Sequence, residues 1–146
     1  MLFDHVAIGG GVIGFNVTFN IVNYIINSKN ISNKSFNFAI IDKKITNLYG
    51  GVAYNIENSI FGYFNNPTRL SPDLFISFLK NNQKFQNEIK DNLKKYNGYV
   101  DKLWLENSYK FLNTKDQNKF SELYLPRSAY GLWQKYRLNN LHEKIS

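Results

Sequence analysis

Asp4-His-Val-Ala-Ile-Gly-Gly-Gly-Val-Ile-Gly-Phe15 is the stretch that decides the fold of this chain. An apolar run from Phe3 to Ile8 predicts a short strand that leads into a glycine turn with GxGxxG spacing. The next apolar residues recur at helical spacing, so we expect a strand, a tight turn and a helix in succession. One side of that helix is expected to carry Val17, Ile21, Val22, Ile25 and Ile26.

The glycine spacing is typical of a site that binds linked phosphates. Gly9 would permit the sharp exit from the strand, and Gly11 would let the backbone approach a pyrophosphate with no Cβ in the way. Gly14 would let the helix pack closely on the strand. The free N–H groups at the start of the helix, with the positive end of its dipole, would then face the anion. The alternative is a βαβ unit whose glycines only make a turn.

A second apolar run supports the phosphate-binding interpretation. It extends from Phe36 to Ile41 and ends on Asp42, whose carboxylate is in place to accept hydrogen bonds from the hydroxyls of an adenosine ribose. Asp42 lies 28 residues after Gly14 (42 − 14), whereas the acidic residue of a dinucleotide-binding motif usually follows its glycines by roughly 20 residues. The polar segment Asn27–Ser35, interpreted as a surface loop, accounts for the excess. The alternative for Asp42 is a solvated residue at a strand end.

Composition indicates a single soluble domain. The chain has 146 residues, of which 43% are hydrophobic and 16% aromatic, within the ordinary range for a globular protein. The absence of cysteine excludes disulfides and thiolate sites and is compatible with the cytoplasm, where we place the protein. No signal peptide and no apolar run of membrane-spanning length is evident. The length is short for a complete flavin or nicotinamide enzyme, so we expect an amino-terminal piece of one.

The net charge of +7 is the only feature that favours a nucleic-acid partner. The lysines are scattered between residues 80 and 119 and alternate with Asp, Glu and Asn, which is typical of a solvated helical surface. No nucleic-acid partner is therefore expected, and a basic nucleic-acid binder is the weakest of the functions considered. Lys43 and Lys44 follow Asp42 and either meet an adenosine or 2′-phosphate or are simply exposed.

The remainder of the chain is predicted to be mostly helical. A first helix starts at the cap Ser71, with Pro72 as its first helical residue, and buries Leu74, Phe75, Phe78 and Leu79. The other expected elements are a loop over 45–66 with a strand or hairpin near 52–64, two helices in 85–112 that break at Asn97-Gly98, a loop over 114–121, an extended run at 123–127 and a final helix from Ser128 to about Lys144.

The sequence offers no obvious catalytic group of its own. The histidines, His5 and His142, have no partners at the spacing of a metal site or a nucleophile. No GxSxG, HExxH or Walker motif occurs. Catalytic residues therefore stay unassigned, no metal site is expected, and any redox chemistry belongs to a bound cofactor.

Three separated segments resemble one family of flavoproteins. They are Val6–Gly14, then Gly50-Gly51-Val52-Ala53-Tyr54 with Asn65-Asn66-Pro67 and Leu70-Ser71, and finally Leu125-Pro126-Arg127-Ser128-Ala129-Tyr130-Gly131. In order and spacing, over almost the whole chain, they resemble the amino-terminal FAD/NAD(P)-binding domain of FAD-dependent urate hydroxylases and L-aspartate N-monooxygenases. The chain departs from the common pattern of that family at Asn66, Thr68 and Leu70.

The resemblance implies an α/β fold: an incomplete Rossmann-like FAD/NAD(P)-binding domain over residues 1–146, with a βαβ start, a parallel sheet and added helices. It implies FAD as cofactor, NAD(P)H as reductant and a small-molecule substrate hydroxylated by a monooxygenase-like reaction. The isolated piece would be inactive. The predicted cofactor-binding residues are Gly9, Gly10, Gly11, Val12, Ile13, Gly14, Asp42, Lys43, Tyr54, Asn65 and Arg127. The alternative is a noncatalytic dinucleotide-binding or interaction module.

Overall fold

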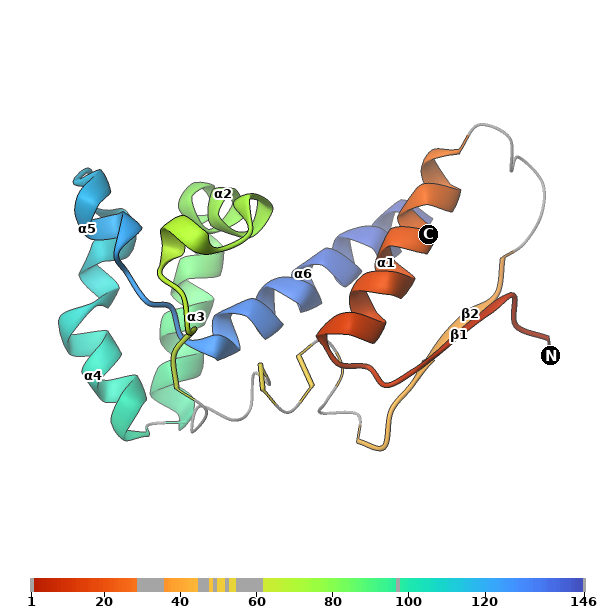
Figure 1. Cartoon of the computed structure of the whole chain (residues 1–146), viewed down its shortest axis with the longest axis horizontal. Coiled ribbons are helices and arrows are strands. Elements are labelled where there is room, and N and C mark those ends of the chain that lie inside the picture. The colour runs from red at the N-terminus through yellow and green to blue at the C-terminus, as the bar shows by residue number, and fades with distance from the viewer. Residues whose placement is uncertain are drawn as a thin grey trace.

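The computed structural model describes residues 2–28, 36–44, 48, 50–51, 53–54, 62–96 and 98–145, without the side chains of 96 and 141–145. Most of the described chain is helical (Figure 1). The strands are β1 (His5–Ile8) and β2 (Phe38–Ile41). The α-helices are α1 (Val12–Asn27), α2 (Asp73–Asn81), α3 (Gln83–Tyr96), α4 (Tyr99–Asn107), α5 (Gln117–Ser121) and α6 (Arg127–Ile145), and the 3₁₀ helices are η3 (Thr68–Leu70) and η4 (Tyr109–Asn113).

The amino-terminal third forms a βαβ unit. β1 and β2 pair in parallel, with His5 opposite Phe38 and Ile8 opposite Ile41. The connecting helix α1 packs on both strands. The Gly9 amide extends the ladder by donating to the Ile41 carbonyl at 2.7 Å. The predicted α/β fold with a βαβ start and a parallel sheet is therefore confirmed, as a mostly helical protein with a two-stranded sheet.

The buried face of α1 differs from the predicted one. Its buried residues are Phe15, Thr18 and Val22, whereas Val17 and Ile26, expected to be inside, are exposed. Two strands cover only a narrow part of the helix, and Thr18 faces β1 through a 3.0 Å hydrogen bond between its Oγ1 and His5 Nε2. An apolar side of a helix is buried only where a partner lies against it.

The helices that follow enclose the main hydrophobic core. Phe75 and Leu79 of α2, Phe85 and Ile89 of α3 and Trp104 of α4 are almost completely buried. The aromatic rings of this core pack edge on or tilted, and the Phe78 and Phe85 centroids, for example, lie 5.0 Å apart. The predicted break at Asn97-Gly98 separates α3 from α4, because Gly98 is the N-cap of α4 and its amide donates to Asp101 at 2.9 Å.

Three of the predicted boundaries are wrong, and one of them is the start of the final helix, which lies at Arg127 and not at Ser128. α2 begins at Asp73 with Pro72 as its N-cap, and the Ser71 hydroxyl instead donates to the Pro67 carbonyl at 3.4 Å. Leu74, predicted to be buried, is 75% exposed. The predicted loop 114–121 contains the short helix α5, whose first turn is capped by the Asp116 carboxylate. The predicted loop near residue 30 and most of the predicted hairpin near 52–64 lie outside the described residues.

Helix α6 joins the two halves of the molecule. Figure 1 shows it running from the α2–α5 helices to the side of α1. Its first turns contribute Ala129, Leu132 and Trp133 to the core. Further along, Arg137 donates to Asn16 of α1 and stacks on the Phe19 ring, with its guanidinium carbon 3.8 Å from the ring centroid. Of the helices that the structure describes, none has the length and apolar character needed to cross a membrane.

Candidate functional site

The glycine turn lies at the junction between β1 and α1. Gly9 has a positive φ of 97°, a conformation that side-chain-bearing residues rarely adopt, so the chain can leave the strand sharply there. Gly11 is the N-cap of α1, and no side chain caps the helix or places an acidic group in its first turn. Helix geometry leaves the first N–H groups of α1 without intrahelical acceptors. The turn therefore presents uncapped donors and the positive end of a helix dipole.

The other two glycines of the motif have different environments. A Cβ at Gly14 would lie 1.9 Å from the Gly9 carbonyl oxygen, so only glycine allows α1 to approach the end of β1 this closely. A Cβ at Gly11 would meet nothing nearer than Gly51 Cα at 3.5 Å, an ordinary contact. The protein itself therefore requires glycine at position 14 but tolerates a side chain at position 11, where the absence of a Cβ leaves room for something else.

Asp42 lies beside the glycine turn, as the sequence predicts. It follows β2 directly, and its Oδ2 accepts a hydrogen bond from the Gly10 amide at 2.7 Å while its Oδ1 accepts from the Lys44 amide at 3.1 Å. Asp42 also borders a hollow of about 300 Å³ with Ile40, Ile41 and Leu48. The carboxylate therefore fixes the turn and still faces a space beside the sheet.

An open cleft of about 740 Å³ lies over the turn. The turn and the first residues of α1 form one wall, and Gly50, Gly51, Ala53 and Tyr54 form the other. Gly51 has φ +59° and approaches Gly11 so closely that a Cβ on it would lie 3.2 Å from Gly11 Cα. No charged side chain is among the residues that line the described cleft. Bare backbone on both walls suits a ligand that must come close to the main chain.

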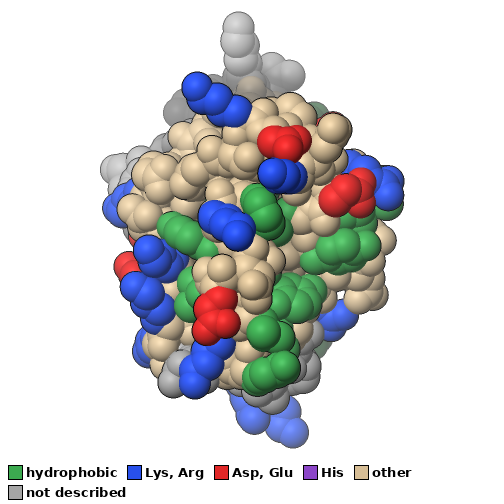
Figure 2. Space-filling model, turned by 90° about the vertical axis from the view of Figure 1, so that its left-hand side faces the viewer, with side chains coloured by type: hydrophobic (Ala, Val, Ile, Leu, Met, Phe, Trp, Pro, Cys, Tyr) green, Lys and Arg blue, Asp and Glu red, His purple; other side chains and the backbone are tan. Residues whose placement is uncertain are grey.

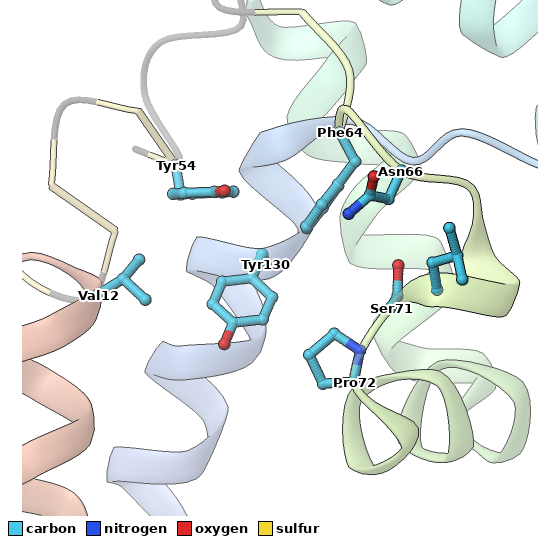
Figure 3. A pocket seen from close by; sticks show the side chains of 8 residues that line it. Val12, Tyr54, Phe64, Asn66, Ser71, Pro72 and Tyr130 are labelled. Atoms are coloured by element: carbon cyan, nitrogen blue, oxygen red, sulfur yellow. The ribbon is translucent and has the colours of Figure 1, made fainter.

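An aromatic pocket of about 210 Å³ continues from the cleft (Figure 3). Val12 and Tyr54 line both spaces. Figure 3 shows Val12 on one side, Ser71 and Pro72 on the other, and three rings between them, those of Tyr54, Phe64 and Tyr130. The centroids of these rings lie 5.4 to 5.8 Å apart. The cleft and the pocket thus meet at Val12 and Tyr54 and form one depression, lined by glycine backbone and aliphatic side chains at one end and by aromatic rings at the other.

The polar groups of the aromatic pocket are neutral. They are the hydroxyls of Tyr54, Ser71 and Tyr130 and the amide of Asn66. Burial raises the pKa of Tyr130 above its ordinary value of 10.0, and this effect exceeds the opposing influence of Asn16 and Arg137. Tyr130 therefore stays protonated at neutral pH and can act as a hydrogen-bond donor.

The structure brings together only some of the predicted site residues. The predicted residues of the glycine turn and Tyr54 line the cleft, except Gly10, which binds Asp42. Arg127 donates to the Tyr63 carbonyl and to Asn65, both at 2.7 Å, and neither Arg127 nor Asn65 lines the cleft or the aromatic pocket. Lys43 is exposed and lines neither space. Arg127 and Asn65 brace the segment that carries Phe64 and Asn66.

Sequence reasoning missed part of the depression. The missed lining residues are Ile8, Gly50, Gly51, Ala53, Phe64, Asn66, Leu70, Ser71, Pro72 and Tyr130. The adjacent pair Gly50-Gly51 in a loop was a usable signal, because two neighbouring glycines permit close approach of the backbone. Tyr130 and Phe64 carried no such signal, because they meet Tyr54 only through long-range packing.

The described part of the chain contains no cluster of metal-binding side chains. No three His, Asp or Glu side chains lie close enough there to hold a metal ion. His5 is hydrogen-bonded to Thr18 at the start of β1, and the side chain of His142 lies outside the described residues. Comparison of the chain with protein-family models, with curated proteins and with solved structures finds no match.

Proposed function

We propose that this chain is the FAD-binding part of a flavin-dependent oxidoreductase, built on a Rossmann-like domain. The observation that carries the proposal is the glycine turn at the β1–α1 junction, which opens onto a cleft and whose Gly10 amide donates to the carboxylate of Asp42. Glycines at the turn, at the point of phosphate approach and at the helix–strand contact are the three features that a dinucleotide pyrophosphate requires.

The order of the spaces supports a dinucleotide over a single phosphate. The hollow beside Asp42 suits an adenosine, the cleft over Gly9 and Gly11 suits the linked phosphates, and the aromatic pocket beyond Val12 suits a planar ring system. Asp42 would bind the ribose hydroxyls from the carboxyl end of β2, beside the turn whose Gly10 amide it accepts. The first amides of α1 would bind the phosphates.

The protein's own role would be placement and shielding. FAD would supply the redox chemistry, and the residues that line the described cleft would hold it in place. Tyr54 and Tyr130 would cover the ring system and donate hydrogen bonds to it, and Asn66 and Ser71 would orient it from the opposite wall. NAD(P)H as reductant and a monooxygenase-like reaction on a small molecule complete the proposal.

A noncatalytic dinucleotide-binding module is the second candidate. The neutral lining of the described cleft favours it, because binding needs no titrating group. NADH oxidation in the presence of FAD can decide in one direction: turnover above that of free FAD indicates an oxidoreductase, whereas FAD binding without turnover is what both candidates predict for this chain alone.

Gly11→Ala tests the binding site itself. Its Cβ fits the protein, so the fold should persist while the affinity for FAD falls at least about tenfold, or about 1.4 kcal/mol. Gly98→Ala is the matched control, because Gly98 is also an N-cap glycine with extended backbone but lies at α4. Equal FAD affinity in the two variants would refute the proposed site.

A further inference from the structure

A second cavity, of about 460 Å³, lies in the helical half of the molecule. The residues that shape it are Tyr63, Trp104, Phe111, Lys119, Glu122 and Tyr124, and we refer to it as the Trp104 pocket. It has no lining residue in common with the cleft or the aromatic pocket. The proposed dinucleotide site therefore leaves it unexplained.

An extended segment separates the Trp104 pocket from the aromatic pocket. Tyr63 pairs with Pro126 in an antiparallel bridge, and the next amide, of Phe64, donates to the Leu125 carbonyl at 2.8 Å. Successive side chains of an extended chain point to opposite sides. Tyr63 accordingly lines the Trp104 pocket and Phe64 lines the aromatic pocket, so the two spaces are distinct sites.

The walls of the Trp104 pocket are largely aromatic, and the polar groups of two of the rings are hydrogen-bonded within the protein. Trp104 is completely buried and closes the floor, and its indole N–H donates to the Tyr124 carbonyl at 2.8 Å. The Tyr63 hydroxyl donates to the Val100 carbonyl at 3.2 Å. The rings of Tyr63, Phe111 and Tyr124 line the space together with Ser108, and their surfaces favour a planar group.

The rim carries one lysine that can meet an anion. Glu122, the acidic residue of the rim, pairs with Arg69, whose Nε lies 2.8 Å from its Oε1. Lys119 is held more loosely, 3.7 Å from Asp116, whose other oxygen accepts from the first amides of α5. An exposed ion pair of that length contributes little, so Lys119 can exchange partners.

The net charge of the helical half is also positive. Residues 62–146 contain 14 Lys and Arg against 8 Asp and Glu, a net +6 of the total +7. Figure 2, which faces the left-hand end of Figure 1, shows apolar side chains set among Lys and Arg side chains, with Asp and Glu side chains interspersed. A positive field raises the local concentration of anions.

We infer that the Trp104 pocket binds a small aromatic carboxylate. The ring lies against Tyr63, Phe111 and Tyr124, and the carboxylate binds the Lys119 ammonium in place of Asp116. The volume falls within the range of about 300 to 1,000 Å³ that is usual for small-molecule sites. This inference does not depend on FAD binding.

The test uses 4-fluorophenylacetate and the full chain without FAD, followed by ¹⁹F NMR. We expect saturable broadening of the fluorine resonance with a dissociation constant of about 1 mM, reasonable for a ligand of this size. Lys119→Gln should weaken binding about tenfold, since a charge-assisted hydrogen bond is lost. The matched control is Lys115→Gln, because Lys115 is an exposed lysine four residues away that does not line the pocket, and it should bind as wild type does.

A neutral analogue completes the test. 4-Fluorophenylacetamide should bind wild type about tenfold more weakly than the acid, and Lys119→Gln should not weaken it further. Tyr124→Leu should weaken both compounds, and because Tyr124 is 45% exposed the variant should fold normally by circular dichroism. Absence of saturable binding in the folded wild type, equal affinity for acid and amide, or equal loss in the Lys119 and Lys115 variants would each overturn the inference.

Discussion

The βαβ unit and the helical half are packed very differently. In the helical half Phe75, Leu79 and Trp104 have no exposed surface, whereas Ile8 and Ile13 beside the glycine turn are 89% and 81% exposed. Parallel sheets are normally covered on both faces, yet in the described structure α1 packs on the two strands and Ile8 and Ile41 stay open on the sheet. The fold thus places its stability in the helices and its proposed ligand contacts in the thinly packed unit.

This division has a thermodynamic consequence. Regions with few buried apolar contacts open at low free-energy cost, and ligand sites are often drawn from such regions. A ligand that binds such a region only when it is folded stabilises the folded form by mass action. We therefore expect substitutions in the helical half to affect the whole molecule and substitutions in the βαβ unit to act locally.

Phe75→Ala should have the largest effect. Phe75 is fully buried, and its ring lies 5.3 to 6.0 Å from those of Phe64, Tyr130 and Trp133, so the variant leaves a cavity at the centre of the core. The free energy of unfolding in urea should fall by about 3 to 5 kcal/mol. Leu74→Ala is the control, since Leu74 is exposed, and should change it by less than about 0.5 kcal/mol. Similar losses in both variants would contradict the location of the core.

Gly14→Ala should have the second-largest effect on stability. The new methyl would collide with the Gly9 carbonyl, and relief of the overlap separates α1 from β1 at a cost of about 1 to 3 kcal/mol. Hydrogen exchange should accelerate at the amides of β1 and β2 and stay unchanged in α3. Gly11→Ala, whose Cβ fits, should leave exchange in all three elements as in wild type. Uniform acceleration across the molecule would show that the two halves unfold as one.

Arg137→Lys should loosen the link between the halves. The guanidinium binds Asn16 and Gln134 at once and stacks on Phe19, and an ammonium cannot reproduce that planar geometry. The free energy of unfolding should fall by about 1 kcal/mol. Amide hydrogen exchange should accelerate more in α1 than in α3. Lys135→Arg, a change on the same helix away from α1, should have no effect. Unchanged exchange in α1 of Arg137→Lys would show that this contact does not join the halves.

Alkaline pH should reveal the smallest effect. Burial, followed by the hydrogen bond to Glu88, raises the pKa of Tyr136 above its ordinary value of 10.0. A phenol whose pKa is raised on folding contributes stability that is complete below pH 10 and declines as the pH rises further. Melting temperatures of wild type should therefore fall more steeply between about pH 9.5 and 11.5 than those of Tyr136→Phe. Parallel curves would contradict this contribution of Tyr136.

The sequence predicted the βαβ unit well and the depression poorly, for physical reasons. The order of strand, Gly9 to Gly14, helix and Asp42 is local, so spacing was enough to place it. α5 was missed because five residues in a polar segment give no periodicity, and only the cap Asp116 marks it. The exposure of Val17 and Leu74 depends on which partners are present, and the meeting of Tyr54 with Tyr130 depends on how α6 returns. Neither the exposure of these side chains nor this contact can be predicted from a local sequence pattern.

Titration of the ¹⁵N-labelled chain with FAD, followed by ¹H–¹⁵N correlation spectra, tests the central claim most directly. If FAD binds at the glycine turn, saturable shifts should appear at the amides of Gly9 to Gly14 and at Asp42, Gly51 and Tyr54, with little change in α3 and α4. Shifts confined to the helical half, or no saturable shifts while the protein remains folded, would contradict it.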